Sequence, residues 1–455
     1  MKDKLTNIIN KCLDTGVDFA DVFSEKKEYK TIKLIDSKID KVNINRVSGM
    51  GIRFIENGEV YYSAINDLSE ENISKVIKEL GSNIVGKSKE HILLTQKNDS
   101  LKKEPKWYYN SDALKKDYLL NIDKIARNID PRINQVIAEM QETTQDVFIA
   151  NTNGNYETER RYLTRLIITL VAKENDKSVQ STFSKGSSLG YEFLEDIDLE
   201  KEINTLAEVT IKKLSAPYAP SGKMPVVVGN GFGVMIHEAC GHALEATSCA
   251  DNISVLANKM GQKVASDCVT IIDDGTLRSL GGTTYIDDEG EKTRKNVLVK
   301  NGIVTGYLVD KVNTKKMKLE VTGSSRRESY CLAPTSRMNN TYLANGDKSF
   351  EEIIGSVDYG IYAKTMGGGQ VNPITGDFNF AVNEAYMIRN GHIEEMVIGA
   401  SLMGNTKEIL NNIEMISNDL DFDLGYCGSV SGNVPVTCGQ PTIKISEILV
   451  GGKDE

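Results

Sequence analysis

The chain has 455 residues, 40% of them hydrophobic, with 64 acidic against 54 basic side chains and a formal net charge of −10. This length exceeds what one hydrophobic core ordinarily serves, so two or three domains are expected, and the composition excludes a collagen, a coiled coil or a wholly disordered chain. The acidic balance argues against nucleic acid as a partner, because affinity for nucleic acid depends on Lys and Arg replacing phosphate counterions.

The N-terminus is polar and lacks the apolar stretch of a secretory signal, and no segment reaches the roughly 18 apolar residues needed to cross a bilayer. We therefore expect no membrane association. The chain contains seven cysteines, an odd number spread over its whole length. Together with the missing signal, this number indicates reduced thiols and a cytoplasmic protein.

The first 85 residues show a helix, then strands, then a second helix. Apolar residues at helical spacing predict a helix over 3–14, and short strands with alternating polarity follow between 20 and 65. Asn57-Gly58 is typical of a hairpin turn between two of these strands. Ser69 then begins a helix that ends near Leu80.

A second unit of helix and strands follows a polar segment, 86–110, which we interpret as a linker. Another tight turn is expected at Asn153-Gly154, and the prolines and glycine of 217–222 indicate the main domain boundary. The predicted elements of this unit are a helix over 111–130, strands over 134–141, 146–151 and 161–173, and a helix over 199–214.

Beyond residue 220, glycine becomes frequent and most of 270–455 is predicted as short strands and turns, with helices only at 231–247, 253–263 and 350–356. The predicted fold class is therefore α+β. Residues 1–220 form an N-terminal part with an antiparallel sheet and helices, with a further boundary near 86–110. Residues 221–455 form a strand-rich, β-barrel-like domain that carries the metal-site helix.

Two of the four histidines, His237 and His242, lie five residues apart, with Glu238 directly after the first. Neutral imidazole is a good zinc ligand, and a neighbouring carboxylate can accept a proton from water that the metal activates. This motif predicts a zinc site held by His237 and His242, with Glu238 as the general base. The alternative is a buried amphipathic helix whose histidines only satisfy polar neighbours.

The five-residue spacing requires an irregular helix. On an ideal α-helix the two histidines would lie about 140° apart around the axis and roughly 7.5 Å along it. Both ring nitrogens could not then reach one metal ion at ~2.1 Å. We therefore predict a bulge or kink at Cys240-Gly241, where glycine gives the backbone most freedom. Glu245 either orients the His242 ring or is a solvated helix residue.

From these motifs the chain resembles the TldD/PmbA metallopeptidases, in particular the TldD-like branch that carries the metal motif. The resemblance covers 225–452 with the most specific motifs, and the N-terminal half agrees in general pattern. The matching segments are 237–245, 286–290, 326–330, 359–363, 366–371, 399–404, 439–442 and 450–452.

The resemblance implies a third metal ligand, Cys427, at the start of a segment that ends Val434-Pro435-Val436. Cys438 and Cys240 are rival ligands, because the sequence between Gly428 and Val434 departs from the usual family residues. The resemblance also implies one Zn²⁺ per chain, small unstructured peptides as substrates, and pairing with a related TldD/PmbA-family subunit or with a second copy.

Two other functions remain open. Cys240 could act as a thiolate nucleophile with a histidine as its base, or the chain could be a non-catalytic subunit that binds peptides. The glycines at 367–369 are typical of a turn, although a peptide could lie along such bare backbone. The acidic run Asp287-Asp288-Glu289 lacks the spacing of a calcium loop and is interpreted as a solvated turn.

Overall fold

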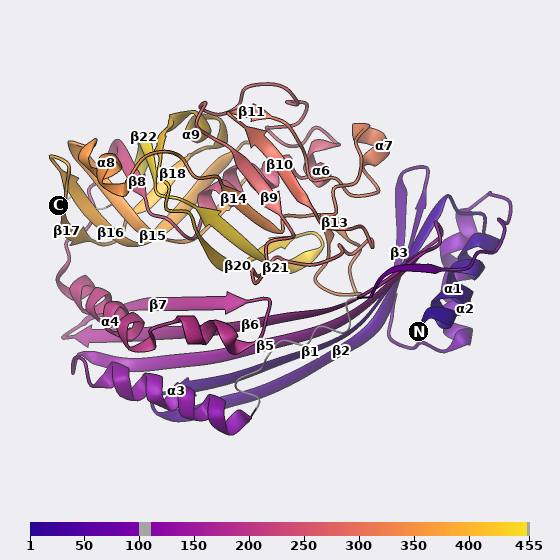
Figure 1. The fold of residues 1–455 in the computed structure, drawn as a ribbon, viewed down its shortest axis with the longest axis horizontal. Coiled ribbons are helices and arrows are strands. Elements are labelled where there is room, and N and C mark those ends of the chain that lie inside the picture. Colours follow the sequence, from indigo (N-terminus) through magenta and orange to yellow (C-terminus); the bar gives the residue numbers. More distant parts are fainter. Residues whose placement is uncertain (100–110, 453–455) are drawn as a thin grey trace.

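The computed structural model describes residues 1–99 and 111–452. A long antiparallel sheet with helices forms the N-terminal part, and a second part made mostly of strands lies over it (Figure 1). This mixed α+β organisation agrees with the predicted fold class.

The N-terminal sheet has the strand order β3-β2-β1-β5-β6-β4, with β7 paired to β6. Tight turns join the paired strands at Asn57-Gly58 and at 152–154, which includes the predicted Asn153-Gly154, and both glycines have positive φ. The strands are β1 (Phe19–Ile35), β2 (Lys38–Glu56), β3 (Glu59–Ile65), β4 (Thr95–Asp99), β5 (Ile133–Asn151), β6 (Asn155–Glu174) and β7 (Lys177–Ser187).

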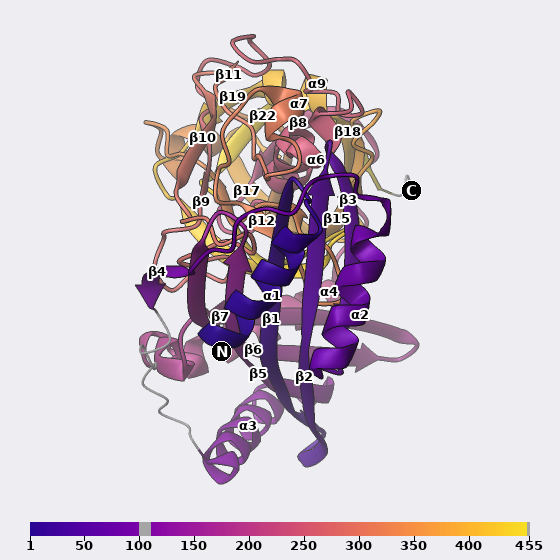
Figure 2. The same cartoon turned by 90° about the vertical axis from the view of Figure 1, so that its right-hand side faces the viewer.

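Helices cover one face of this sheet. Side chains alternate between the two faces of a strand, so the apolar residues that contact the helices are mostly even-numbered. Even-numbered residues such as Val22 and Ile52 pack with α1 and α2, whereas Ile32 and Met140 pack with α3 and α4. Figure 2 shows α1 and α2 beside each other at one end of the long strands. The helices are α1 (Lys2–Asp14), α2 (Glu70–Leu80), α3 (Asp112–Arg127) and α4 (Leu199–Ser215), with the short turns η1 (Gly81–Asn83) and η2 (Tyr191–Asp196).

The C-terminal part contains a closed barrel of five strands, β15-β8-β22-β18-β16, in which β16 pairs back to β15. This barrel confirms the expected barrel-like domain. Strand β17 pairs with β16 at the edge, and β19 pairs with β22. The strands are β8 (Gly222–Val228), β15 (Tyr359–Val371), β16 (Asp377–Arg389), β17 (His392–Val397), β18 (Ser401–Asn405), β19 (Ile413–Ile416) and β22 (Ile443–Gly451).

A second sheet, β11-β10-β9-β14-β21-β20, packs beside the barrel and shares its apolar core. Its last hairpin, β20–β21, faces the N-terminal sheet (Figure 1). The strands are β9 (Ile271–Asp274), β10 (Lys295–Lys300), β11 (Ile303–Val304), β14 (Asn340–Leu343), β20 (Asp421–Ser429) and β21 (Gly432–Gln440). A small pair, β12 (Ser325–Arg326) and β13 (Thr335–Ser336), and the helices α7 (Thr314–Met317), α8 (Phe350–Gly355) and α9 (Thr406–Asn412) complete this part.

Several predicted elements differ from the observed ones. The strands predicted at 134–141 and 146–151 are one continuous strand, β5, and part of the predicted linker is β4, while 100–110 lie outside the described residues. The helix predicted at 253–263 is wrong, because this segment consists of turns, in which the Ser254 hydroxyl donates to the Ala243 carbonyl. The glycines at 367–369 lie inside β15, at an irregularity in its pairing with β16, and do not form a turn.

The acidic run at 287–289 is buried, so its interpretation as a solvated turn is wrong. Glu289 and Asp21 both form ion pairs with Arg53, which is 0% exposed. Asp288 forms an ion pair with Arg161 of β6 at 2.6 Å. Because Arg53 and Arg161 belong to the N-terminal sheet, these buried pairs join the two parts of the molecule.

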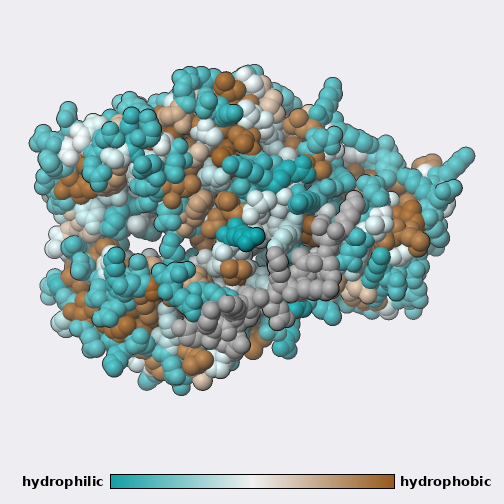
Figure 3. Space-filling view, viewed as in Figure 1, coloured by the Kyte–Doolittle hydropathy of each residue, from teal (hydrophilic) through white to brown (hydrophobic). Residues whose placement is uncertain are grey.

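Hydrophilic residues cover most of the face shown in Figure 3. Among the described residues, no helix has both the length and the apolar character needed to cross a membrane.

Candidate metal centre

The histidine motif follows the central strand β8, at the point where the chain leaves the barrel. Gly231 adopts φ +97°, a conformation that favours glycine, and its N–H donates to the Gln440 carbonyl of β21 at 3.0 Å. The short helix α5 (Val234–Ile236) begins after this turn and packs against the barrel core. The turn therefore fixes where the next residues enter the C-terminal core.

The backbone of the motif is π-helical. Segment η3 (His237–Gly241) is followed by a 3₁₀ turn, η4 (His242–Leu244), and by α6 (Ala246–Cys249). The His242 N–H donates to the His237 carbonyl, which is the i→i+5 bond of a π turn. The predicted irregularity at Cys240-Gly241 is thus confirmed. The wider turn brings the two imidazoles together, with ring centroids 5.2 Å apart.

Gly241 allows this turn to pack against β14 and the residues before it. A Cβ at this position would lie 1.9 Å from the Sδ of Met338, far inside van der Waals contact. The glycine therefore has a steric role in addition to the conformational one that the sequence suggested.

Three potential ligand atoms meet beside the π turn. The donor atoms of His237, His242 and Cys427 all lie within 4.8 Å of one another. Cys427 is on β20, and its Sγ lies 3.2 Å from His242 Nε2. Among the described His, Cys, Asp and Glu side chains, these three lie close enough together to hold a metal ion.

His237 fits a metal ligand because neither of its ring nitrogens has a hydrogen-bond partner, although the residue is only 2% exposed. Such orphaned buried polar atoms are costly. Burial, together with the charges of His242 and Arg337, holds the pKa of His237 well below its usual range. The ring is therefore neutral, as a ligand must be.

His242 is oriented by Glu245, whose Oε2 lies 3.0 Å from Nδ1, so that Nε2 faces Cys427. Of the two roles left open for Glu245, the structure shows the orienting one, with a buried carboxylate. Burial lowers the pKa of His242, but Glu245 and the Cys427 thiol outweigh it and raise this pKa well above its usual value. A divalent cation at this point would compete with that proton.

Arg337 supports both halves of this cluster, and the sequence reasoning missed it. Its guanidinium is 0% exposed and donates to the Cys427 carbonyl and, at 2.8 Å, to the Gly432 carbonyl. Its Nε lies 4.0 Å from Glu245 Oε1, and neither of these two atoms has a hydrogen-bond partner. Arg337 therefore connects the hairpin that carries Cys427 with the carboxylate that orients His242.

Glu238 lies at the more open side of the cluster. Its Oε2 is 3.8 Å from His242 Nε2, and its side chain retains 18% of its exposure. Burial, reinforced by the nearby Glu245 charge, raises the pKa of Glu238, while His242 and Arg337 lower it. A carboxylate with a raised pKa next to three ligand atoms can accept a proton and return it.

The rival cysteines, Cys240 and Cys438, are buried thiols. Cys240 belongs to the apolar core, where burial raises the pKa of its thiol to about 12. Burial also raises the pKa of Cys438 well above its usual value. Neither residue belongs to the group that could hold a metal.

Taken together, the fold and the site define a mixed α+β protein with a two-histidine, one-cysteine cluster and an adjacent glutamate. Sequence models of the PmbA/TldA metallopeptidase domain 1, central domain and C-terminal domain match residues 20–84, 106–215 and 221–452, respectively. The chain therefore belongs to the TldD/PmbA metallopeptidase family.

Relatives agree over almost their full length. The metalloprotease TldD homolog of Haemophilus influenzae is 35% identical and covers 98% of this chain and 96% of its own. The zinc metalloprotease TldD homolog of Saccharolobus solfataricus is 27% identical, with 98% and 99% covered. The crystal structure of TldE from Thermococcus kodakarensis superimposes with a TM-score of 0.75 at 19% identity, covering 99% of this chain and 100% of that one, and shows the same fold.

Proposed function

We propose that this chain is a zinc-dependent peptidase that hydrolyses small, unstructured peptides. The observation that carries the proposal is the buried His237 ring. Neither of its nitrogens has a hydrogen-bond partner, and the ring lies next to His242 and Cys427. The names of the relatives, metalloprotease and zinc metalloprotease, support the same activity.

In this proposal His237, His242 and Cys427 hold one Zn²⁺. Three protein donors leave a further coordination position, which suits a catalytic site better than a closed structural one. Bound zinc supplies Lewis-acid polarisation of the scissile carbonyl and of a water molecule. Glu238 accepts the proton of the attacking water and passes it to the departing amine, and its raised pKa suits both steps.

We further propose that the protein is cytoplasmic and pairs with a related TldD/PmbA-family subunit or with a second copy. The likeness to TldE supports such a pairing. The alternative of a Cys240 nucleophile is disfavoured by the burial and raised pKa of that thiol. The non-catalytic alternative gives no reason for a glutamate placed 3.8 Å from a ligand nitrogen.

Metal content tests this proposal. Wild type purified without chelators should contain about one zinc per chain, and His237→Ala and Cys427→Ala should lose it, because each removes one of three donors. Cys438→Ala is the matched control, since it removes another buried thiol from the same hairpin and should retain the metal.

Glu238→Gln separates catalysis from metal binding. This variant should retain zinc and lose peptide hydrolysis by about 10²–10⁴-fold, the usual contribution of a positioned proton acceptor. A metal-free wild type that still hydrolyses peptides would overturn the zinc mechanism. A metal-loaded wild type that hydrolyses no member of a mixed peptide library would support the non-catalytic alternative.

A further inference from the structure

The face of the N-terminal sheet opposite its helices is polar where it crosses beneath the C-terminal part. Odd-numbered residues of four adjacent strands form rows across this face. One row is Val47, Lys27, Gln145 and Arg161, and the next is Asn45, Tyr29, Thr143 and Leu163. These rows turn charged and amide side chains toward the C-terminal part.

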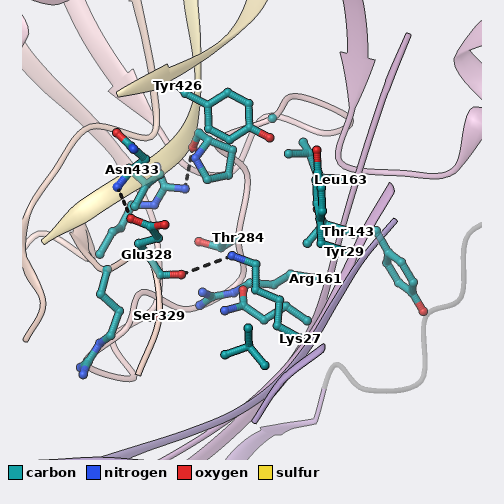
Figure 4. Close-up of a pocket in the computed structure, with 18 of the residues that line it drawn as sticks. Lys27, Tyr29, Thr143, Arg161, Leu163, Thr284, Glu328, Ser329, Tyr426 and Asn433 are labelled. Carbon is teal, nitrogen blue, oxygen red and sulfur yellow. Dashed lines mark hydrogen bonds between the residues drawn. The ribbon is translucent and has the colours of Figure 1, made fainter. Parts of the chain in front are cut away.

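A cavity of about 750 Å³ separates this face from the C-terminal part. Its opposite wall consists of the β20–β21 hairpin, residues from 281–288, and residues from 326–331. Figure 4 shows Tyr426 and Asn433 on the hairpin side, across from Thr143 and Leu163 of the sheet. The volume lies within the range of small-molecule and peptide pockets and exceeds what an inorganic ion would fill.

The cavity is cationic, although the whole protein carries a net charge of −10. Five basic side chains line it, against two acidic ones. Both acids are engaged: Asp288 pairs with Arg161, and Glu328 Oε2 accepts from the Asn433 N–H at 2.8 Å. The basic side chains are Lys27, Arg161, Arg165, Arg326 and Arg327.

Four of these five basic side chains form no ion pair with any carboxylate among the residues that the structure describes. Lys27 Nζ donates to the Glu328 carbonyl at 3.3 Å, and Arg165 Nε donates to the Ser184 hydroxyl at 2.7 Å. The Arg165 guanidinium also lies over the Tyr426 ring. Cations held in a partly enclosed cavity without a direct ion pair favour an anionic ligand.

The cavity and the metal cluster lie on opposite faces of β20. Successive side chains of a strand point to opposite faces, so Tyr426 lines the cavity while the neighbouring Cys427 is buried toward the histidines. Neither Glu238 nor any of the three candidate ligands lines the cavity. A ligand held there would therefore contact the strand that carries Cys427 without occupying the metal cluster.

We propose that this cavity binds the carboxylates of an acidic peptide segment, through the charges of Lys27 and Arg165, which form no ion pair with a carboxylate of the described residues. The proposal rests on the proposed peptidase function, because it selects the class of peptide that the protein would hold. Tyr29 and the amide side chains of the sheet face offer hydrogen bonds to the peptide backbone. The cavity thus acts as an anchoring site apart from the reacting bond.

The test is a binding measurement on the metal-loaded Glu238→Gln protein, which does not turn the peptide over. Fluorescence anisotropy compares three labelled peptides of one length, with four Glu, four Gln or four Lys between Gly-Ser flanks. The Glu peptide should bind about tenfold more tightly than the Gln peptide, equivalent to about 1.4 kcal/mol. This preference should shrink as salt concentration rises.

The variant Lys27→Gln/Arg165→Gln should reduce the Glu-peptide preference to within about twofold, because it removes the two charges proposed to hold the carboxylates. Its control, Lys75→Gln/Lys124→Gln, removes the same net charge from exposed helix positions and should keep the preference. Circular dichroism of each variant shows whether the fold is retained.

Equal binding of the Glu and Gln peptides would overturn the proposal, as would a preference that survives in Lys27→Gln/Arg165→Gln. Displacement of the Glu peptide by an equal concentration of inorganic phosphate would show a simple anion site and would also overturn it. Hydrolysis of the Gln peptide by the protein with Glu238 intact is measured separately. If the protein does not hydrolyse the peptide but keeps the binding preference, the proposed peptidase function is refuted, whereas the proposed role of the cavity in binding acidic peptides is not.

Discussion

Replacing Gly241 with Ala tests whether the π turn positions the metal ligands. The new Cβ would lie 1.9 Å from Met338 Sδ and 3.0 Å from Met338 Cε, so at least one of the two segments must move. To restore ordinary van der Waals contact, one of these segments must move by about 1.5 Å. A catalytic group misplaced by a distance on this scale can lower the reaction rate by about 10²-fold.

The size of the effect on stability follows from the packing. Overfilling a well-packed core costs about 1–3 kcal/mol, so the melting temperature of the C-terminal part should fall by several degrees. The backbone dihedrals of Gly241 are ordinary for an α-helical residue, so the cost comes from the clash with Met338 and not from strain. The clash should also move His242 relative to His237 and weaken metal binding.

Three measurements on Gly241→Ala check this reasoning: zinc affinity by competition with a chelator, thermal melting, and peptide hydrolysis. Gly241→Ala/Met338→Ala should recover part of the loss, with a coupling of about 0.5–3 kcal/mol between the two sites. Gly355→Ala is the matched control, because nothing lies within 4 Å of a Cβ there. A Gly241→Ala protein with unchanged melting temperature and zinc affinity would refute the positioning role of the turn.

Three further predictions follow from buried charges. Arg337→Met should lower zinc affinity by about 10–100-fold in a chelator competition, because it removes the buried support behind the ligands, and Arg337→Lys should not restore it. Arg53→Met should lower the free energy of unfolding by about 3–5 kcal/mol, seen as a lower melting temperature, because Asp21 and Glu289 would remain buried without a cation. Arg46→Met, at an exposed ion pair, should lower it by less than about 1 kcal/mol. Burial raises the pKa of Asp273 from 3.8 to about 6, so the folded protein binds this proton more tightly than the unfolded chain, and stability is lost as pH rises from about 4 to 6. The melting temperature of Asp273→Asn, measured relative to wild type, should therefore be higher at pH 7 than at pH 5. An equal difference at the two pH values would contradict this.

The histidine part of the candidate site could be predicted from sequence because its chemistry is local. His237, Glu238 and His242 lie within six residues, and their spacing alone required the irregular turn that the structure contains. Cys427 came only from the family resemblance, since no local pattern joins it to residues 185 positions away. Arg337 gave no signal, because a lone arginine looks the same in sequence whether exposed or buried.

The errors in the fold have a common physical origin in polar residues that are not solvated. The polar stretch Glu142–Gln145 suggested a break between two strands, but β5 continues through it because its odd-numbered residues line a polar cavity. The run at 287–289 suggested a solvated turn, but Asp288 and Glu289 form ion pairs with arginines more than a hundred residues away. Periodicity assumes that polar side chains face water, and both segments violate that assumption.

The separation of the ligands along the chain also sets an order of events during synthesis. His242 and Cys427 are 185 residues apart, which corresponds to roughly 10–40 s of translation at usual rates. Throughout this interval an emerging chain offers a metal ion the histidine pair without the thiolate. The complete three-donor cluster forms only when β20 has been made, pairs with β21 and docks. We therefore expect tight metal binding only after Cys427 has been synthesised, and chains cut short before Cys427 to lack tightly bound metal.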